Sequence, residues 1–361
     1  MKKILTIIGA RPQFIKASVV SKAILENDNL QEIIVHTGQH FDKNMSDIFF
    51  EQLSIPRPHY LLDINGGSHG DMTGRMLIEI EKVLLNERPD CVLVYGDTNS
   101  TLAGALAAAK LHIPVAHVEA GLRSFNMNMP EEVNRILTDR VSNILFCPTE
   151  TAISNLNNEG YPFITSNGFK QKITNVGDVM QDSALLFSRQ AVAPRNAKLP
   201  NRFILATIHR AENTNDLERL SNILEALNDI SKNISIILPI HPRTLNIINR
   251  NKFDTNNILF IDPVGYFEML WLLKNSELVV TDSGGVQKEA FFMEKACITM
   301  RDQTEWIELV NLGVNELVGA NKEKILDAVN RNIGRKVIDT NQLYGGGEAS
   351  KRIVVELEKY L

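Results

Sequence analysis

Cysteine, long hydrophobic runs and a strong excess of one charge are all scarce or missing in this chain of 361 residues. The three cysteines, Cys91, Cys147 and Cys297, stand singly in apolar runs and form no CxxC pair, which favours buried, reduced thiols. No apolar stretch approaches the roughly 20 residues of a membrane span, and Arg11 interrupts the N-terminal apolar run before a signal-peptide core can form. We therefore expect a cytoplasmic protein that does not enter a membrane.

The charges nearly balance, with 38 Lys+Arg against 43 Asp+Glu and a formal net charge of -5. A protein that binds a nucleic acid usually presents a strongly positive face, so this composition argues against such a partner. With 44% hydrophobic residues, 21 Gly and 13 Pro the composition is that of a globular protein. At roughly 100 to 200 residues per domain the length predicts two domains.

Short β-branched runs alternate with helical patterns in both halves of the chain, and a polar, proline-containing stretch at 189–202 separates the two sets. Continuous apolar strands of this kind are typical of parallel sheets that are buried on both faces. The sequence therefore predicts an α/β protein with two Rossmann-like, doubly wound domains that face a central cleft. The runs are 4–9, 32–38, 91–97, 114–119, 144–148 and 173–177, then 203–209, 235–241, 258–263, 278–282 and 296–302.

Polar residues end these runs, at the sheet edge where ligands bind in open α/β folds. Asp97 and Glu119 end two runs that one short helical segment joins, so both carboxylates are expected at one rim, as a candidate acid and base. Arg11 and Lys16 lie in the first predicted helix and are candidate cations for a diphosphate. A lysine at such a position is more often a solvated surface charge, so Lys16 is the weaker candidate.

The segment TDSGGVQKEA is typical of a phosphate cradle. Gly284 and Gly285 let backbone N–H groups approach an anion, and the helix expected from Val286 directs its positive end at it. A plain strand-to-helix turn is the alternative. Glu289, in the first turns of that helix, either accepts sugar hydroxyls or is a surface residue that offsets the helix dipole.

The histidines suggest phosphate chemistry more than a metal. His209 ends the first run of the second half and is a candidate phosphate donor or acid. His36, His40, His117 and His241 form no HExxH pattern and no Cys/His ligand spacing, so no metal is expected. P-loop, GxSxG and GxGxxG patterns are also missing, which argues against an NTPase, a serine hydrolase or an NAD enzyme.

The segment MPEEVNRILTDRVS predicts a helix with an apolar face formed by Val133, Ile136, Leu137 and Val141. Glu131 and Arg135 would lie opposite that face, one turn apart. From spacing alone, this arrangement favours a solvated ion pair over a functional one.

Nine motifs, in one order over nearly the whole chain, resemble those of the non-hydrolysing UDP-N-acetylglucosamine 2-epimerase family. They are GARPQFIK, HTGQH, YGDTNST, HVEAGLRS, MPEEVNR, NVGDVMQDS, HRAEN, DPVGY and TDSGGVQKEA. The resemblance implies the GT-B fold, a homodimer, and a last helix that returns to the first domain instead of capping the second. The domains expected are 1–175 plus 345–361, which carries the carboxylates, and 176–344, which binds UDP.

The resemblance also implies a reaction. The family inverts carbon 2 of a UDP-2-acetamido sugar by eliminating UDP to a 2-acetamidoglucal and adding it back, without NAD or a metal. Asp97, Glu119 and Glu131 would then be the acid/base carboxylates, and His209 would support the departure of UDP. Substrate and UDP binding would fall to Arg11, Lys16, Arg135, His241, Tyr266, Ser283, Gly284, Gly285 and Glu289.

The chain departs from the family pattern in three places. Trp306 replaces an arginine of the family's TERPE, and restoring arginine there is expected to change substrate preference more than fold. Asp42 replaces a polar amide, and an arginine is missing around His69, which argues against regulation by a second UDP-sugar.

The sequence segments HRAEN, RDQTEW and QLYGGGEAS are most similar to those of one branch of the family. That branch epimerises UDP-2,3-diacetamido-2,3-dideoxyglucuronic acid to the manno form for surface polysaccharide. The alternatives are a UDP-GlcNAc 2-epimerase, a hydrolysing epimerase, a GT-B glycosyltransferase and an inactive UDP-sugar sensor.

Overall fold

The computed structural model describes residues 1–39, 55–164, 170–195, 198–339 and 342–361. They form two compact units, unit 1 of Met1–Ser183 with Gln342–Leu361, and unit 2 of Ala184–Asn341. The change of unit falls within the helix α7 (Val179–Phe187), whereas the sequence places it at residue 176. His40 and Asp42, two residues considered in the sequence, lie outside the described residues.

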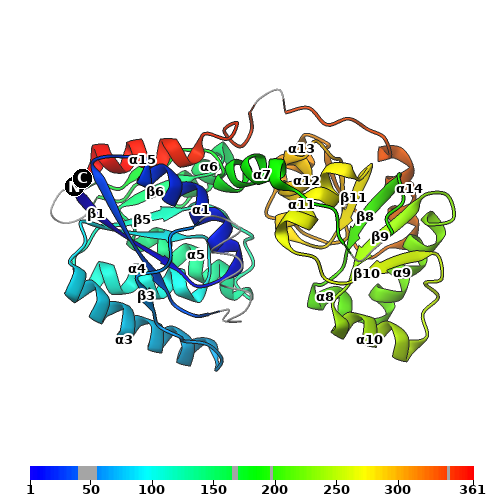
Figure 1. Cartoon of the computed structure of the whole chain (residues 1–361), viewed down its shortest axis with the longest axis horizontal. Coiled ribbons are helices and arrows are strands. Elements are labelled where there is room, and N and C mark those ends of the chain that lie inside the picture. The colour runs from blue at the N-terminus through cyan, green and yellow to red at the C-terminus, as the bar shows by residue number, and fades with distance from the viewer. Residues whose placement is uncertain (40–54, 165–169, 196–197, 340–341) are drawn as a thin grey trace. The chain divides into compact units, whose positions relative to one another are not determined.

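Unit 1 contains a parallel sheet of seven strands with the order β3-β2-β1-β4-β5-β6-β7 (Figure 1). The six runs of the first half are confirmed as strands, and each strand ends one or two residues earlier than predicted. The short strand β3 is not predicted, since two residues show no alternation. The strands are β1 (Lys2–Ile8), β2 (Leu30–His36), β3 (Tyr60–Leu61), β4 (Cys91–Tyr95), β5 (Val115–Val118), β6 (Ile144–Cys147) and β7 (Lys172–Asn175).

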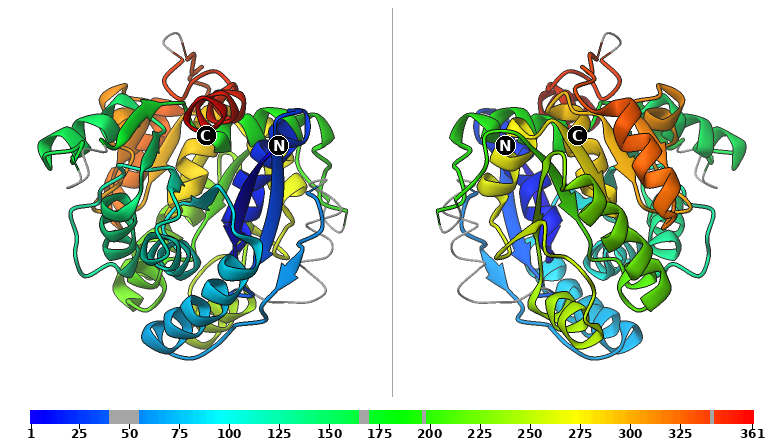
Figure 2. Two further views of the ribbon diagram at one scale, coloured as in Figure 1. Left: turned by 90° about the vertical axis from the view of Figure 1, so that its left-hand side faces the viewer. Right: turned by 90° about the vertical axis from the view of Figure 1, so that its right-hand side faces the viewer.

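Helices cover both faces of this sheet, with α1 and α15 on one face and α3 and α4 on the other (Figures 1 and 2). Side chains of Ser68, Thr98 and Thr149 cap the first turns of α3, α4 and α6 by accepting a backbone N–H. Besides α7, the helices of unit 1 are α1 (Arg11–Leu25), α3 (His69–Glu87), α4 (Asn99–Lys110), α5 (Pro130–Val141), α6 (Glu150–Asn158) and α15 (Ala349–Tyr360).

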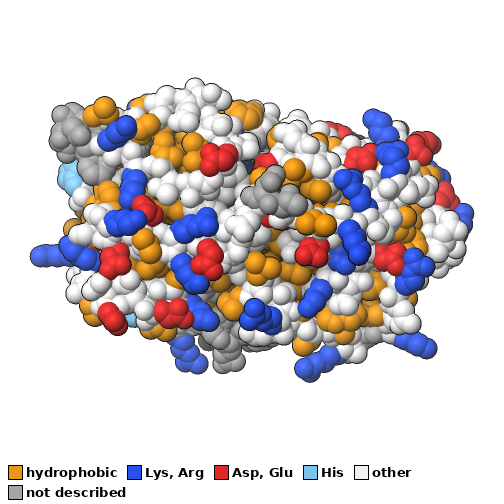
Figure 3. All heavy atoms as spheres, turned by 90° about the horizontal axis from the view of Figure 1, so that it is seen from above, with side chains coloured by type: hydrophobic (Ala, Val, Ile, Leu, Met, Phe, Trp, Pro, Cys, Tyr) orange, Lys and Arg blue, Asp and Glu red, His pale blue; other side chains and the backbone are white. Residues whose placement is uncertain are grey.

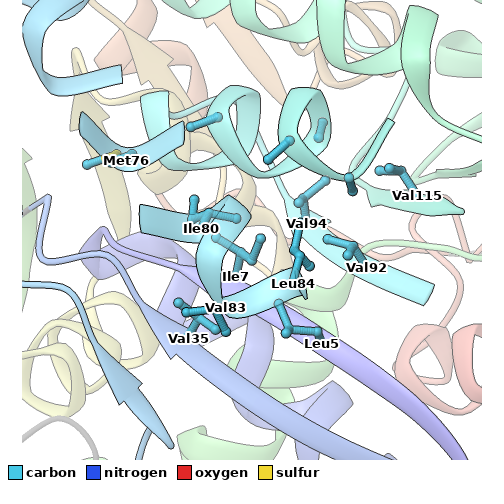
Figure 4. Packing of buried hydrophobic residues seen from close by; sticks show 14 of the residues in the cluster. Leu5, Ile7, Val35, Met76, Ile80, Val83, Leu84, Val92, Val94 and Val115 are labelled. Carbon is cyan, nitrogen blue, oxygen red and sulfur yellow. The ribbon is translucent and has the colours of Figure 1, made fainter. Parts of the chain in front are cut away.

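An apolar cluster of unit 1 lies between the sheet and the helices α3 and α4 (Figure 4). It joins Leu5 and Ile7 of β1 to Met76 and Ile80 of α3. Helix α4 approaches β1 closely because Gly104 has no side chain: a Cβ there would lie 2.6 Å from Cδ1 of Ile7. The packed sheet gives the loops after β4 and β5 a rigid base.

Unit 2 contains a second parallel sheet, with the order β10-β9-β8-β11-β12-β13. All five runs predicted for this half are confirmed, and the three-residue β13 is additional. The strands are β8 (Phe203–Thr207), β9 (Ser235–Pro239), β10 (Ile258–Ile261), β11 (Leu278–Thr281), β12 (Cys297–Thr299) and β13 (Asn315–Leu317). The helices are α8 (Ala211–Thr214), α9 (Leu217–Ile230), α10 (Pro242–Asn251), α11 (Tyr266–Asn275), α12 (Gly284–Phe292), α13 (Ile307–Asn311) and α14 (Lys322–Asn332), with a 3-10 turn at Ser188–Gln190.

The last helix, α15, belongs to unit 1, where it packs against α1 (Figure 2). The buried carboxylate of Asp182 accepts the backbone N–H groups of Ala349 and Ser350 at 3.1 and 2.7 Å, and so caps the start of α15. Gly177 and Tyr344 touch through their backbones, since a Cβ on Gly177 would lie 2.6 Å from the carbonyl oxygen of Tyr344. The return implied by the resemblance is therefore what the structure contains, and α15 does not cap unit 2.

Charge and apolar side chains are distributed over the surface as the composition suggests. On the face in Figure 3, acidic and basic side chains alternate with apolar ones. Within the described ranges, no helix combines the length and the hydropathy that crossing a bilayer requires. Cys91, Cys147 and Cys297 are buried free thiols, as predicted.

Candidate active site

The turn after β4 is shaped around Gly96. This residue has φ +62°, and a Cβ on it would lie 3.2 Å from both the Oε2 of Glu119 and the Nζ of Lys16. The preceding carbonyl, of Tyr95, accepts hydrogen bonds from the Nε2 of Gln13 at 2.9 Å and the Oγ1 of Thr101 at 2.7 Å. Only glycine suits a left-handed turn with so little room, so this turn brings the backbone before Asp97 close to Glu119.

Glu119 follows β5 in a backbone conformation that is rare outside glycine, with φ +74°. Its carboxylate is buried, and it forms a short ion pair with the ammonium of Lys16 from α1. The side chain of Lys16 is only 12% exposed, so the prediction of a solvated surface charge is wrong for this residue. Strained backbone of this kind persists where the surrounding structure holds it and gathers at functional sites.

Asp97 pairs with a second cation, Arg135 of α5. The Nη2 of Arg135 lies 2.7 Å from the Oδ2 of Asp97, and its Nη1 lies 2.7 Å from the Oε2 of Glu132. Glu132 also accepts the backbone N–H groups of Ser124 and Phe125, at 3.0 and 2.9 Å. Burial raises the pKa of Glu132, but these hydrogen bonds and Arg135 outweigh burial and hold it below its usual value.

The helix α5 is oriented differently from the prediction. Leu137, placed on the apolar face, is 42% exposed, and Glu131 is exposed. The buried face is polar, because the loops after β4 and β5 leave backbone groups that need hydrogen-bond partners in the interior. It consists of Glu132, Asn134, Arg135, Thr138 and Asp139. The expectation of a solvated ion pair is therefore wrong for Arg135, which is buried and pairs with Glu132.

We call the side chains in these ion pairs the carboxylate cluster of unit 1. It consists of Lys16, Asp97, Glu119, Glu132 and Arg135. Glu132 was not predicted as a site residue, although its i,i+3 spacing to Arg135 permitted an ion pair. Two cations paired with carboxylates at adjacent strand ends can bind an anionic substrate and exchange a proton with it.

Arg11 is the first residue of α1, the helix that also carries Lys16. Burial lowers the pKa of its guanidinium. Within the described part of the chain, no group of three or more His, Cys, Asp or Glu side chains is arranged to hold a metal ion.

In unit 2 the equivalent strand ends meet at Asp282, which is fully buried after β11. Its carboxylate accepts the backbone N–H groups of His209 and Arg210 at 3.1 and 3.0 Å, and the Nδ1 of His209 lies 3.0 Å away. Burial raises the pKa of Asp282, but the hydrogen bonds from His209 and its neighbours outweigh burial and lower it overall. The imidazole of His209 itself is 54% exposed, so it is oriented by Asp282 and open to a ligand.

The helix α12 begins at Gly284, two residues before the position predicted, and Ser283 is its N-cap. The Oγ of Ser283 accepts the N–H of Val286 at 3.4 Å. A Cβ on Gly284 would lie 2.4 Å from the Oε1 of Glu305, so a larger residue there would have to displace that carboxylate. The exposed N-terminus of a helix after a strand end is suited to a phosphate.

Glu289 and Tyr266 lie inside unit 2. Glu289 is 7% exposed, so its interpretation as a surface residue that offsets the helix dipole is wrong. Burial, with the nearby carboxylate of Glu289, raises the pKa of Tyr266 well above its usual value. His241, by contrast, is exposed and caps α10, where its Nδ1 accepts the N–H of Arg243 at 3.3 Å.

Trp306 has a packing role that the sequence did not show. The indole is 4% exposed, and its Nε1 donates to the carbonyl oxygen of Gly284 at 2.9 Å. The buried ammonium of Lys288 lies 3.9 Å from the centre of the ring, a cation–π contact. Trp306 therefore stabilises the first turn of α12 through its hydrogen bond to Gly284.

We predict that Trp306→Arg destabilises unit 2, because it removes a large buried ring and sets a guanidinium beside Lys288. The expected loss is about 3 kcal/mol, against about 1 kcal/mol for Trp306→Phe, which loses the hydrogen bond and some ring volume but keeps an aromatic ring beside Lys288. Thermal unfolding of the two variants measures this difference. Equal stability of Trp306→Arg and the parent would instead support the expectation that this position changes substrate preference more than fold.

The architecture and the site together define a class of protein. Two α/β units, each with a parallel sheet and with polar groups after its strands, form the GT-B fold, as predicted. The chain belongs to the UDP-N-acetylglucosamine 2-epimerase family, which it matches over residues 22–358.

Several relatives are similar over nearly their whole length. The chain is 64% identical over 358 residues to the UDP-2,3-diacetamido-2,3-dideoxy-D-glucuronate 2-epimerase of Pseudomonas aeruginosa, with 99% of each chain covered. The structure of the Methanocaldococcus jannaschii UDP-GlcNAc 2-epimerase in complex with UDP-GlcNAc and UDP has a TM-score of 0.84, with 45% identity and 99% of each chain covered. The Neisseria meningitidis UDP-GlcNAc 2-epimerase bound to UDP-GlcNAc has a TM-score of 0.86 and 31% identity, with 99% of this chain and 100% of that chain covered.

Proposed function

We propose that this protein inverts carbon 2 of UDP-2,3-diacetamido-2,3-dideoxyglucuronic acid, giving the manno epimer, without net hydrolysis. The observation that carries the reaction is the carboxylate cluster, in which Asp97 and Glu119 are each held by a cation at adjacent strand ends. The choice of sugar rests on the Pseudomonas aeruginosa relative, which is named for this substrate. We place the reaction in the cytoplasm, in a homodimer, as a step towards surface polysaccharide.

The proton at carbon 2 is not acidic, so the reaction we propose begins with elimination. The bond between carbon 1 and the diphosphate oxygen breaks, UDP leaves, and the proton of carbon 2 passes to a carboxylate. The product is a 2-acetamidoglucal. UDP then adds back to carbon 1 while a carboxylic acid protonates carbon 2 from the opposite face, so atoms and charge balance over the cycle.

In this proposal Asp97 and Glu119 exchange the proton with carbon 2. Lys16 orients Glu119, and Arg135 orients Asp97. Arg11 binds the diphosphate. Glu131 is exposed in the first turn of α5. We propose it as a third carboxylate for the proton transfer.

The UDP would be bound by the residues of unit 2 that follow β8 and β11. His209, held by Asp282, would stabilise the departing diphosphate, and the N-terminus of α12 at Ser283, Gly284 and Gly285 would bind its phosphates. Glu289 would accept the ribose hydroxyls. Two further residues, His241 and Tyr266, are proposed as contacts to the nucleotide.

Hydrogen exchange with the solvent tests the chemistry. The protein is incubated in D2O with the UDP sugar, and the recovered UDP sugar is analysed by NMR and mass spectrometry. Deuterium at carbon 2 with UDP still attached is expected. Unlabelled sugar after full turnover would exclude this reaction, free UDP in equal amount to free sugar would indicate a hydrolysing epimerase, and transfer to an acceptor would indicate a glycosyltransferase.

The alternative substrate is UDP-GlcNAc, for which the Methanocaldococcus jannaschii relative is named. A panel that compares the two sugars under the same conditions decides between them. We expect a higher kcat/KM for the diacetamido uronate, and a preference for UDP-GlcNAc would replace the substrate proposed here while leaving the reaction unchanged.

A further inference from the structure

A buried histidine connects the two strand ends that carry Asp97 and Glu119. His117 lies on β5, two residues before Glu119, and its side chain is fully buried. Its Nε2 lies 2.7 Å from the carbonyl oxygen of Gly96, and its Nδ1 lies 2.7 Å from the Oδ1 of Asp139 on α5. One imidazole thus joins β5, the turn after β4 and α5.

The partners of this ring define its protons. A carbonyl oxygen can only accept a hydrogen bond, so the Nε2 of His117 must carry a proton. The carboxylate of Asp139 also accepts the Nη1 of Arg123 at 2.8 Å and the backbone N–H of Gly121 at 3.1 Å. Both of these donors meet the Oδ2 of Asp139, and the ion pair with Arg123 favours the ionised carboxylate, so the Oδ1 of Asp139 accepts the Nδ1 proton as well.

The charged side chains around the ring belong to two opposite pairs. Arg123 forms a bidentate ion pair with Glu159, at 2.6 and 2.9 Å, in addition to its contact with Asp139. A doubly protonated His117 and Arg123 would together face two anions, Asp139 and Glu159. The nearby titratable groups Cys147 and Tyr161 remain neutral, because burial raises the pKa of each.

We propose that His117 is a positioning residue, held as an imidazolium, that fixes the Gly96 peptide and thereby the separation of Asp97 and Glu119. The left-handed turn at Gly96 has its carbonyl held by this ring, and the Asp97 carbonyl after it is held by the Nδ2 of Asn134 at 2.8 Å. If the Gly96 peptide turned, Asp97 would lose its register with Arg135. The effect on catalysis rests on the function proposed above, whereas the protonation state does not.

The protonation state is measured directly on the parent protein. In protein labelled with 15N-histidine, a doubly protonated ring shows one-bond coupling to hydrogen at both nitrogens. We expect this signature for His117 at the assay pH, with the exposed His112 as an internal reference. A neutral ring with one bare nitrogen would overturn the proposal, whatever the enzymatic activity.

Two amide variants separate the two contacts. The amide nitrogen of glutamine overlays the Nε2 of histidine, so His117→Gln keeps the donor to Gly96, whereas His117→Asn keeps only the donor to Asp139. We expect kcat of His117→Asn to fall at least about 100-fold with KM within a few-fold of the parent, and kcat of His117→Gln to stay within about 10-fold.

The kinetic result has two contrary outcomes. Unchanged kcat in His117→Asn, or equal losses in both variants, would show that the contact with Gly96 does not position the carboxylates. If the parent lacks activity on both UDP sugars, the proposed function fails, and the NMR measurement still decides the state of His117. The same measurement decides it if neither variant folds.

Discussion

Glu119→Gln is expected to lower the rate of exchange at carbon 2 by about 10²- to 10⁴-fold, the range that a single acid–base group contributes. Glutamine keeps the shape of the side chain, and Lys16 can still donate to its amide oxygen, but the amide cannot take up a proton. UDP binding should be retained, because most of the proposed UDP ligands lie in unit 2, and Glu119 is not one of them. Deuterium incorporation and calorimetry with UDP measure the two properties separately.

A matched control for this variant is Glu323→Gln, which makes the same chemical change at an exposed position in the first turn of α14. It should exchange at the parent rate. If Glu119→Gln also exchanged at the parent rate, Glu119 would not carry the proton. If it lost UDP affinity as well as exchange, a general loss of structure would be the simpler explanation.

Arg135→Ala should loosen unit 1 around α5 by about 3 kcal/mol. The guanidinium holds Asp97 and Glu132 at 2.7 Å each, and the Glu132 side chain is only 1% exposed. Removal of one member of a buried ion pair leaves the remaining charge uncompensated, which is the costly way to break it. Hydrogen exchange of the backbone amides of α5 measures the local opening free energy.

Arg140→Ala is the control on the same helix, where the lost contact is a cation–π interaction with Phe163 at an exposed position. Its cost should stay below about 1 kcal/mol. Adding Glu132→Gln to Arg135→Ala should restore part of the protection, because it removes the charge that lost its partner. If Arg135→Ala and Arg140→Ala left the backbone amides of α5 equally protected from exchange, the role given to Arg135 would be contradicted.

The sequence predicted most of the fold, because parallel strands buried on both faces leave a strong signal. Eleven apolar runs became strands, and among the strands of the described residues only the very short β3 and β13 were missed. The residues after the strands were also found, since Asp97 and Glu119 follow strands in any correct assignment. Lys16 and Arg135 were also named as site residues, but their pairing with these two carboxylates was not predicted, because which face of a helix is buried depends on what the rest of the chain places against it.

The helix α5 illustrates this limit. Its sequence contains an apolar stripe and a charged stripe, and the general preference for burying apolar residues selects the wrong one. The interior of unit 1 at this point needs hydrogen-bond partners for loop backbones, which Glu132 and Asp139 supply. Buried polar residues such as His117 leave no periodic signal of their own, so only the structure reveals them.

The capping of α15 by Asp182 has a consequence for the order of synthesis. Unit 2 is an insertion between α7 and α15, so the ribosome completes it before the last helix of unit 1 emerges. Until then the surface of α1 that receives Ile353, Val354 and Leu357 is uncovered, and the carboxylate of Asp182 lacks the N–H groups it caps. The helix α15 thus completes a unit whose first strand, β1, is synthesised before unit 2.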